Sequence, residues 1–126
     1  MTFWNEKIET MPREELEAMQ LDLLKKLIKN TYKGSSFYRA KMDAAKVRPE
    51  DIRTLDDIRK LPFMKKTDLR DNYPDGLFMR PYEEIVRVHV SSGTTGKPIV
   101  VGYTHNDLEN WSESLARGMT SFGMGK

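Results

Sequence analysis

The chain has 126 residues, which is enough for one average domain but leaves little room for two independent cores. Lysine and arginine number 21 against 19 aspartate and glutamate residues, and the two signs are interspersed, which argues against a nucleic-acid partner. The sequence has no cysteine, so it excludes disulfide frameworks, thiol nucleophiles and cysteine-based zinc sites.

The N-terminal segment carries no targeting signal, because no basic stretch is followed by an apolar run. The longest purely aliphatic stretch is Ile99–Val101, far too short to cross a bilayer. We therefore expect a soluble, cytoplasmic protein without membrane contact.

An amphipathic helix is the first predicted element, between Pro12 and Asn30. Proline suits the first turn of a helix, where no backbone donor is needed. Acids share the polar face with lysines, so we expect this helix to pack against other helices rather than lie on a membrane surface. Its apolar stripe consists of Leu16, Met19, Leu23, Leu24, Leu27 and Ile28.

Three shorter helical elements are predicted between this helix and residue 80. Each begins near a hydroxyl-bearing residue that can cap a helix, and the two later ones end at a proline-containing turn. Thr54 with Asp57 is typical of a capping box in which aspartate replaces glutamate. The elements run from Ser35 or Ser36 to about Lys46, from Thr54 to Leu61-Pro62, and from Thr67-Asp68 to Tyr73–Gly76. Residues 1–80 are therefore expected to form an all-helical unit.

The hydrophobic period then changes from helical to two residues near residue 85, which is typical of a strand. A glycine-rich loop, a β-branched segment and a capped helix follow. The predicted elements are a strand at 86–90, a strand at 99–103, and a helix capped by Thr104 and Asp107 that runs towards Gly123. The fold class is therefore α+β or α/β, with the start of an α/β domain at residues 81–126.

The loop Ser91–Pro98 carries the strongest functional signal. It contains no acid, two glycines, four hydroxyls and one lysine in eight positions. Gly93 and Gly96 can adopt positive φ, so that successive N–H groups turn inward as an anion nest. The hydroxyls add uncharged donors, and Lys97 adds a mobile cation that can follow the oxygens of a polyphosphate. The loop therefore predicts a phosphate-binding site.

Two common nucleotide-binding motifs do not fit this loop. A Walker loop needs four residues between its glycines and a Gly-Lys-Ser/Thr that leads into a helix. Here two residues separate Gly93 from Gly96, Lys97 is followed by Pro98, and a strand is expected next. A dinucleotide fingerprint is also absent, because no Gly-x-Gly-x-x-Gly occurs. A plain hairpin turn is the remaining, non-functional interpretation.

The loop resembles the phosphate-binding motif of the adenylate-forming superfamily of acyl-CoA synthetases, luciferases and peptide-synthetase adenylation domains. Its surroundings are similar to the phenylacetate–CoA ligase branch in particular, along the whole chain. The segments that carry this resemblance are Val86–Pro98, Val100–Thr104, Ser35–Tyr38, Leu61–Phe63, Lys66–Arg70 and Asn72–Pro74. Members of that family are several times longer, so the chain is similar to the start of such an enzyme.

The resemblance implies an ATP-dependent acid–CoA ligase that acts on phenylacetate or another aryl acid. The acid carboxylate attacks the α-phosphate of MgATP, pyrophosphate leaves, and the thiol of coenzyme A attacks the acyl adenylate. ATP, Mg²⁺ and coenzyme A are the implied cofactors. Residues 81–126 would begin the AMP-binding domain, while the acid pocket, the ribose-binding carboxylate and the mobile C-terminal domain would lie beyond Lys126. The implied partners are that remaining chain and a second copy in a homodimer.

The expected phosphate ligands are Ser91, Ser92, Gly93, Thr94, Thr95, Gly96 and Lys97. Such donors can stabilise the charge that grows on a leaving pyrophosphate. Lys66 is a candidate catalytic residue, because it lies in a family-like stretch from which it can swing towards the triphosphate; a solvated surface lysine is the alternative. His89 fits a scaffold residue better than a catalyst, and we expect no metal site in the chain.

Two alternative functions stay open. A close one is an adenylating enzyme for a different acid, similar to coenzyme F390 synthetase, and nothing before Lys126 separates the two. The other is a helical interaction module that carries a phosphate-binding hairpin and has no catalytic activity. Under the enzyme interpretation, the 126 residues alone are expected to be inactive.

Overall fold

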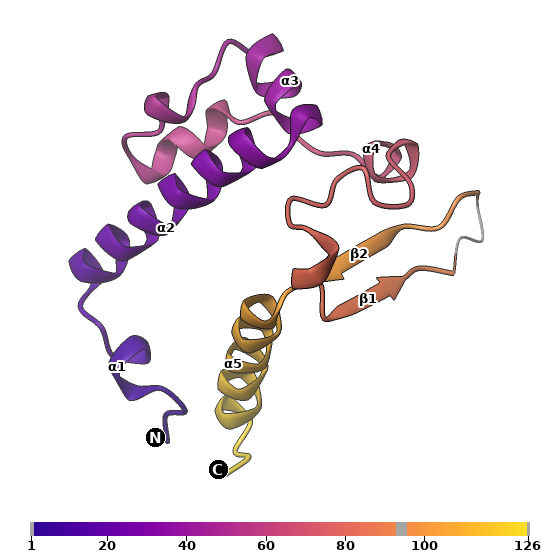
Figure 1. Ribbon diagram of the computed structural model, residues 1–126. Helices are drawn as coiled ribbons and strands as arrows, with labels where there is room; N and C mark the ends of the chain where they lie inside the picture. Colours follow the sequence, from indigo (N-terminus) through magenta and orange to yellow (C-terminus); the bar gives the residue numbers. More distant parts are fainter. Residues whose placement is uncertain (1, 93–95, 126) are drawn as a thin grey trace.

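The helix α2 is the longest element of the N-terminal half. In the computed structural model, which describes residues 2–92 and 96–125, α2 spans Arg13–Gly34 (Figure 1). Pro12 is the N-cap rather than a first-turn residue, and the helix continues past Asn30. Glu14 and Glu15 lie in its first turn, where carboxylates offset the positive end of the helix dipole. The sequence therefore predicted the helix and placed both of its ends slightly too early.

The shorter helices appear where their capping residues predicted them. Ser35 Oγ accepts a hydrogen bond from Tyr38 N at 3.1 Å, which settles the choice between Ser35 and Ser36. Thr54 N donates to Asp57 Oδ2 at 2.7 Å, as in the expected capping box. These elements are α3 (Ser36–Ala44), the 3-10 helix η2 (Leu55–Lys60) and α4 (Lys66–Asp71). The sequence analysis missed three very short elements: α1 (Glu6–Glu9), η1 (Pro49–Asp51) and η3 (Tyr82–Glu84).

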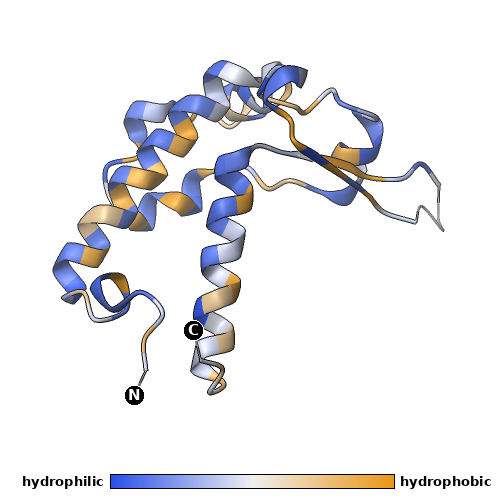
Figure 2. Ribbon diagram, turned by 60° about the horizontal axis from the view of Figure 1, so that its bottom comes forward, coloured by the Kyte–Doolittle hydropathy of each residue, from blue (hydrophilic) through white to orange (hydrophobic). Residues whose placement is uncertain are grey.

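The buried core joins α2, α3 and the segment that follows α3. Met42 is fully buried and Ile52 is 1% exposed, and they pack with Ile28 and Val47. Leu23 and Leu27, by contrast, are 54% and 56% exposed although they belong to the predicted apolar stripe. Figure 2 shows apolar residues recurring along α2. Only part of the stripe is therefore covered by the helices of this chain.

An ion pair connects α3 to α4. Lys41 Nζ lies 2.6 Å from Asp68 Oδ2, and both side chains are largely buried. Asp68 Oδ2 also accepts a hydrogen bond from Lys65 N at 2.8 Å, at the start of α4. The hydrogen bond from Lys41, followed by that from Lys65, lowers the pKa of Asp68 from its ordinary value of 3.8. The ionised carboxylate therefore holds α4 against the helical core.

Replacing Asp68 with asparagine is expected to lower the melting temperature at neutral pH and to lower it much less in acid. A folded-state pKa below 3.8 means that the carboxylate stabilises the fold above pH 3.8, and that this contribution is lost as the pH falls through the lower, folded-state pKa. The measurement is the melting temperature of both proteins from about pH 7 down to about pH 2. Asp71→Asn, at the exposed end of the same helix, is the control. An equal difference at every pH would contradict the role of the charge.

A β-hairpin and a helix form the C-terminal part. β1 (Arg87–Val90) pairs with β2 (Val100–Tyr103) in antiparallel register, and α5 (His105–Ser121) follows. Thr104 caps α5 through Asp107, as the sequence predicted. Among the described residues this hairpin is the only sheet, so the chain is mostly helical with a small two-stranded hairpin. No helix in the described ranges is long and apolar enough to cross a membrane.

Gly102 lets the segment between α4 and β1 pass close to β2. A Cβ at this position would lie 2.9 Å from the Phe78 ring and 3.2 Å from Ile85. Any larger residue would have to push one of these side chains away. The segment between α4 and β1 therefore packs directly on the hairpin and ties it to the helical part.

Candidate functional site

The loop between the strands is closed at its base by two reciprocal contacts. Ser91 N donates to Ile99 O at 2.9 Å, and Ile99 N donates to Ser91 Oγ at 2.9 Å. The last strand pair, Val90 with Val100, lies directly below them. The loop leaves the hairpin at the edge of the molecule (Figure 1). The Ser91 hydroxyl accepts here, and its own proton stays available to a ligand.

The described residues of the loop are open to solvent. Ser92, Gly96 and Lys97 are exposed, and no atom lies within 4 Å of the position that a Cβ on Gly96 would take. Gly96 has a φ of 126°, which confirms the expected positive φ at this glycine. The other expected ligands, Gly93, Thr94 and Thr95, lie outside the described residues. Ser92, Gly96 and Lys97 are therefore not covered by other described parts of the chain.

The electrostatics of the hairpin favour an anion. Between Glu84 and Asp107 the sequence has no carboxylate. Glu84 lies 3.8 Å from Arg80, and Asp107 accepts two hydrogen bonds from Thr104. No ion pair within the described residues engages Lys97. Its ammonium is therefore available to an incoming polyphosphate.

Lys66 is exposed as the first residue of α4. Helix α4 and the hairpin lie on the same side of the molecule in both ribbon views (Figures 1 and 2). Among the described residues no hydrogen bond joins Lys66 to Ser91, Ser92 or Lys97. Lys66 therefore lies on α4 without a hydrogen bond to the described residues of the loop.

An aromatic cluster that the sequence analysis missed fixes α5 on the hairpin. Tyr103 stacks on Trp111 with ring centroids 5.5 Å apart, and His89 contacts both rings edge-on at 5.0 and 5.6 Å. The ring residues of this cluster were visible in the sequence. The observed register places Arg87, His89, Val101 and Tyr103 on one face of the hairpin, which brings the rings together. His89 therefore has a scaffold role. No group of three potential metal ligands occurs in the described part of the chain.

Comparisons with known proteins show which proteins the chain resembles. No family model matches the chain. The phenylacetate–coenzyme A ligase of Thermus thermophilus is 53% identical over 117 residues, and that of Escherichia coli is 52% identical over 116 residues. The chain is homologous to the phenylacetate–CoA ligases. These matches cover 93% and 92% of the chain but 26% of each relative, so the chain spans about a quarter of the length of these ligases.

A solved CoA ligase has the same fold as this chain over the matched region. The 2-hydroxyisobutyryl-CoA ligase, solved in complex with 2-HIB-AMP and CoA, superposes on 93% of this chain with a TM-score of 0.83 and 32% sequence identity. The matched part is 26% of that ligase. The helical arrangement, the hairpin and α5 are therefore shared with a ligase that was solved with 2-HIB-AMP and CoA bound.

Proposed function

We propose that this chain belongs to an ATP-dependent acid–CoA ligase and that its Ser91–Pro98 loop binds the phosphates of ATP. The observation that carries this proposal is a loop of glycines, hydroxyls and one lysine, closed at its base by the Ser91–Ile99 contacts and open to solvent at Gly96 and Lys97. The names of the relatives support a ligase that uses CoA. Residues 81–126 would then begin the AMP-binding domain.

The residues of this loop would act by binding and by charge stabilisation. The reaction joins an acid to AMP, releases pyrophosphate, and passes the acyl group to CoA. Backbone N–H groups around Gly96 and the hydroxyls of Ser91 and Ser92 would hold the phosphate oxygens. Lys97 would offset the negative charge that grows on pyrophosphate as it leaves. Lys66 would approach the triphosphate from α4.

Magnesium would reach this site together with ATP. The described residues supply no cluster of carboxylates or histidines that holds an ion. Mg²⁺ keeps several waters and commonly binds through substrate phosphates with one or two carboxylates. Mg²⁺ would therefore arrive as part of the MgATP complex rather than as a resident metal held by a ligand cluster of the described residues.

Phenylacetate is the acid that the comparisons favour. The four curated relatives, 45–53% identical to the chain, are all phenylacetate–CoA ligases, whereas the 2-hydroxyisobutyryl-CoA ligase is 32% identical. The test is acid-dependent pyrophosphate release by a complete ligase that carries this sequence, with phenylacetate and 2-hydroxyisobutyrate compared at equal concentration. A preference for 2-hydroxyisobutyrate would refute the aryl-acid assignment, and no release with either acid would refute the ligase.

Residues 1–126 alone are expected to form no acyl-CoA from ATP, phenylacetate and CoA. They span about a quarter of the relatives, and by resemblance the acid pocket and the C-terminal domain lie in the other three quarters. The measurement is phenylacetyl-CoA formed by the purified chain, beside a reaction without protein. Product above that blank would show that the rest of the enzyme is dispensable.

A further inference from the structure

The N-terminal segment is joined to α5 through one carboxylate. Trp4 Nε1 donates to Glu113 Oε2 at 2.7 Å, and Asn5 Nδ2 donates to Glu113 Oε1 at 2.8 Å. These contacts bridge 109 and 108 sequence positions. Hydrogen bonds to an ionised acceptor are the stronger kind, and all three residues are partly buried. We refer to Trp4, Asn5 and Glu113 as the Glu113 clasp.

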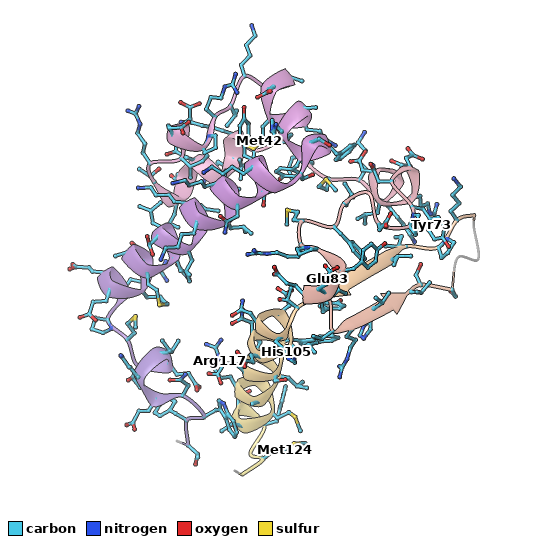
Figure 3. All side chains as sticks on the ribbon, viewed as in Figure 1. Met42, Tyr73, Glu83, His105, Arg117 and Met124 are labelled. Atoms are coloured by element: carbon cyan, nitrogen blue, oxygen red, sulfur yellow. The ribbon has the colours of Figure 1, made fainter. Side chains whose placement is uncertain are left out.

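The clasp joins the residues just before α1 to the middle of α5. In Figure 1, α1 lies between the N-terminal end of α2 and the C-terminal part of α5, and Figure 3 shows Arg117 on the side of α5 that faces α1. A cavity of about 330 Å³ is lined by Phe3 and Glu9 together with Thr120 and Met124. The N-terminal segment therefore follows the last turns of α5 and is held there by more than one contact.

The other ends of α2 and α5 meet across a cleft. This cleft, of about 860 Å³, is lined by the C-terminal half of α2, the segment 79–86 and residues 104–107 at the start of α5. Among the described residues no hydrogen bond or ion pair crosses it directly from α2 to α5. The two helices are therefore linked by the connecting segment beside the cleft and by the clasp at the middle of α5.

Each of these helices carries one part of the candidate site. α5 is fixed to the hairpin by the stacking of Trp111 on Tyr103, and the hairpin carries the loop. α2 packs with α3, which holds α4 and Lys66 through the Lys41–Asp68 pair. A change in the angle between α2 and α5 would therefore move Lys66 relative to the loop.

We propose that Glu113 is a positioning residue, which sets the orientation of the helical unit that carries Lys66 towards the phosphate loop. It does so by holding Trp4 and Asn5 against the middle of α5, about two turns from the end that lines the cleft. The link to phosphate chemistry rests on the proposed function. The control of the α2–α5 angle does not, so it can be tested separately.

The test uses residues 1–126, which contain no cysteine. Gln20→Cys on α2 and Asn110→Cys on α5 place two spin labels at exposed positions without background labelling. Double electron–electron resonance then measures the distribution of distances between the labels. Trp4→Phe keeps an aromatic ring and removes the Nε1 donor together with part of the indole, while Glu113→Gln removes the charge. Glu109→Gln, an exposed carboxylate one turn earlier on α5, is the matched control.

We expect one narrow distribution in the parent protein and in Glu109→Gln, and a broader, shifted one in Trp4→Phe and Glu113→Gln. The ratio of closed to open clasp should fall by about tenfold or more, on the scale of a lost hydrogen bond to a charged group. The double variant should be no broader than Glu113→Gln, because both changes act on one contact.

Circular dichroism at the same temperature checks that each variant keeps its helices. If Glu113→Gln unfolds, the distances measured in Trp4→Phe alone test the proposal. Unchanged distances in Trp4→Phe would overturn the proposal. So would a lower melting temperature with unchanged distances, which would mark a merely stabilising contact. If the loop variants do not affect pyrophosphate release, the proposed phosphate site is refuted. The proposed control of the α2–α5 angle is not affected by that result.

Discussion

Lys97→Ala is expected to lower the rate of adenylate formation by about 10- to 1000-fold in a complete ligase that carries this sequence. Lys97 is exposed at the open side of the loop, and no carboxylate among the described residues pairs with it. If the loop holds the β- and γ-phosphates, its ammonium offsets charge that develops as pyrophosphate leaves. The measurement is phenylacetate-dependent pyrophosphate release at saturating ATP, recorded beside the melting temperature of each variant.

Thr95→Ala extends this test to a hydroxyl donor. Thr95 lies outside the described residues, so its role is predicted from the loop sequence alone, and the expected loss is in the same range of about 10- to 1000-fold. Lys29→Ala, an exposed lysine on α2, is the control and should change nothing measurable. A plain hairpin turn predicts the opposite pattern, with normal rates and any loss following stability. If both loop variants release pyrophosphate at the wild-type rate with unchanged stability, the proposal that this loop binds the phosphates is refuted.

Local signals in the sequence predicted most of the secondary structure. Ser35, Thr54 and Thr104 mark helix starts because their side chains or those of their capping partners satisfy backbone N–H groups, and the structure shows these contacts. The first strand followed from valines at a period of two, and the second followed from a continuous stretch of β-branched residues. The very short elements α1, η1 and η3 escaped detection, because three or four residues are too few for any hydrophobic period.

Long-range contacts were the part that the sequence could not supply. The pattern of α2 marks Leu23 and Leu27 as apolar, but it does not say that more than half of each residue stays exposed. Trp4 and Glu113 lie at opposite ends of the sequence, and no local pattern links them. The candidate site shows the same division between local and long-range features. Its composition indicated phosphate binding, whereas the Ser91–Ile99 closure and the packing of His89 under α5 depend on strand register.

The burial of Met42 in the core has a direct energetic consequence. This side chain is 0% exposed and packs with Ile28, Val47 and Ile52, so Met42→Ala would leave a cavity that the surrounding helices fill only in part. The expected loss is about 2–5 kcal/mol of unfolding free energy, a large share of the stability of a small helical unit. Met124→Ala, the same change at a position 53% exposed, should cost far less. Urea unfolding of residues 1–126 measures both. Equal losses would show that Met42 is not in the core, whereas a large loss at Met42 alone would confirm that α2 and α3 fold around it.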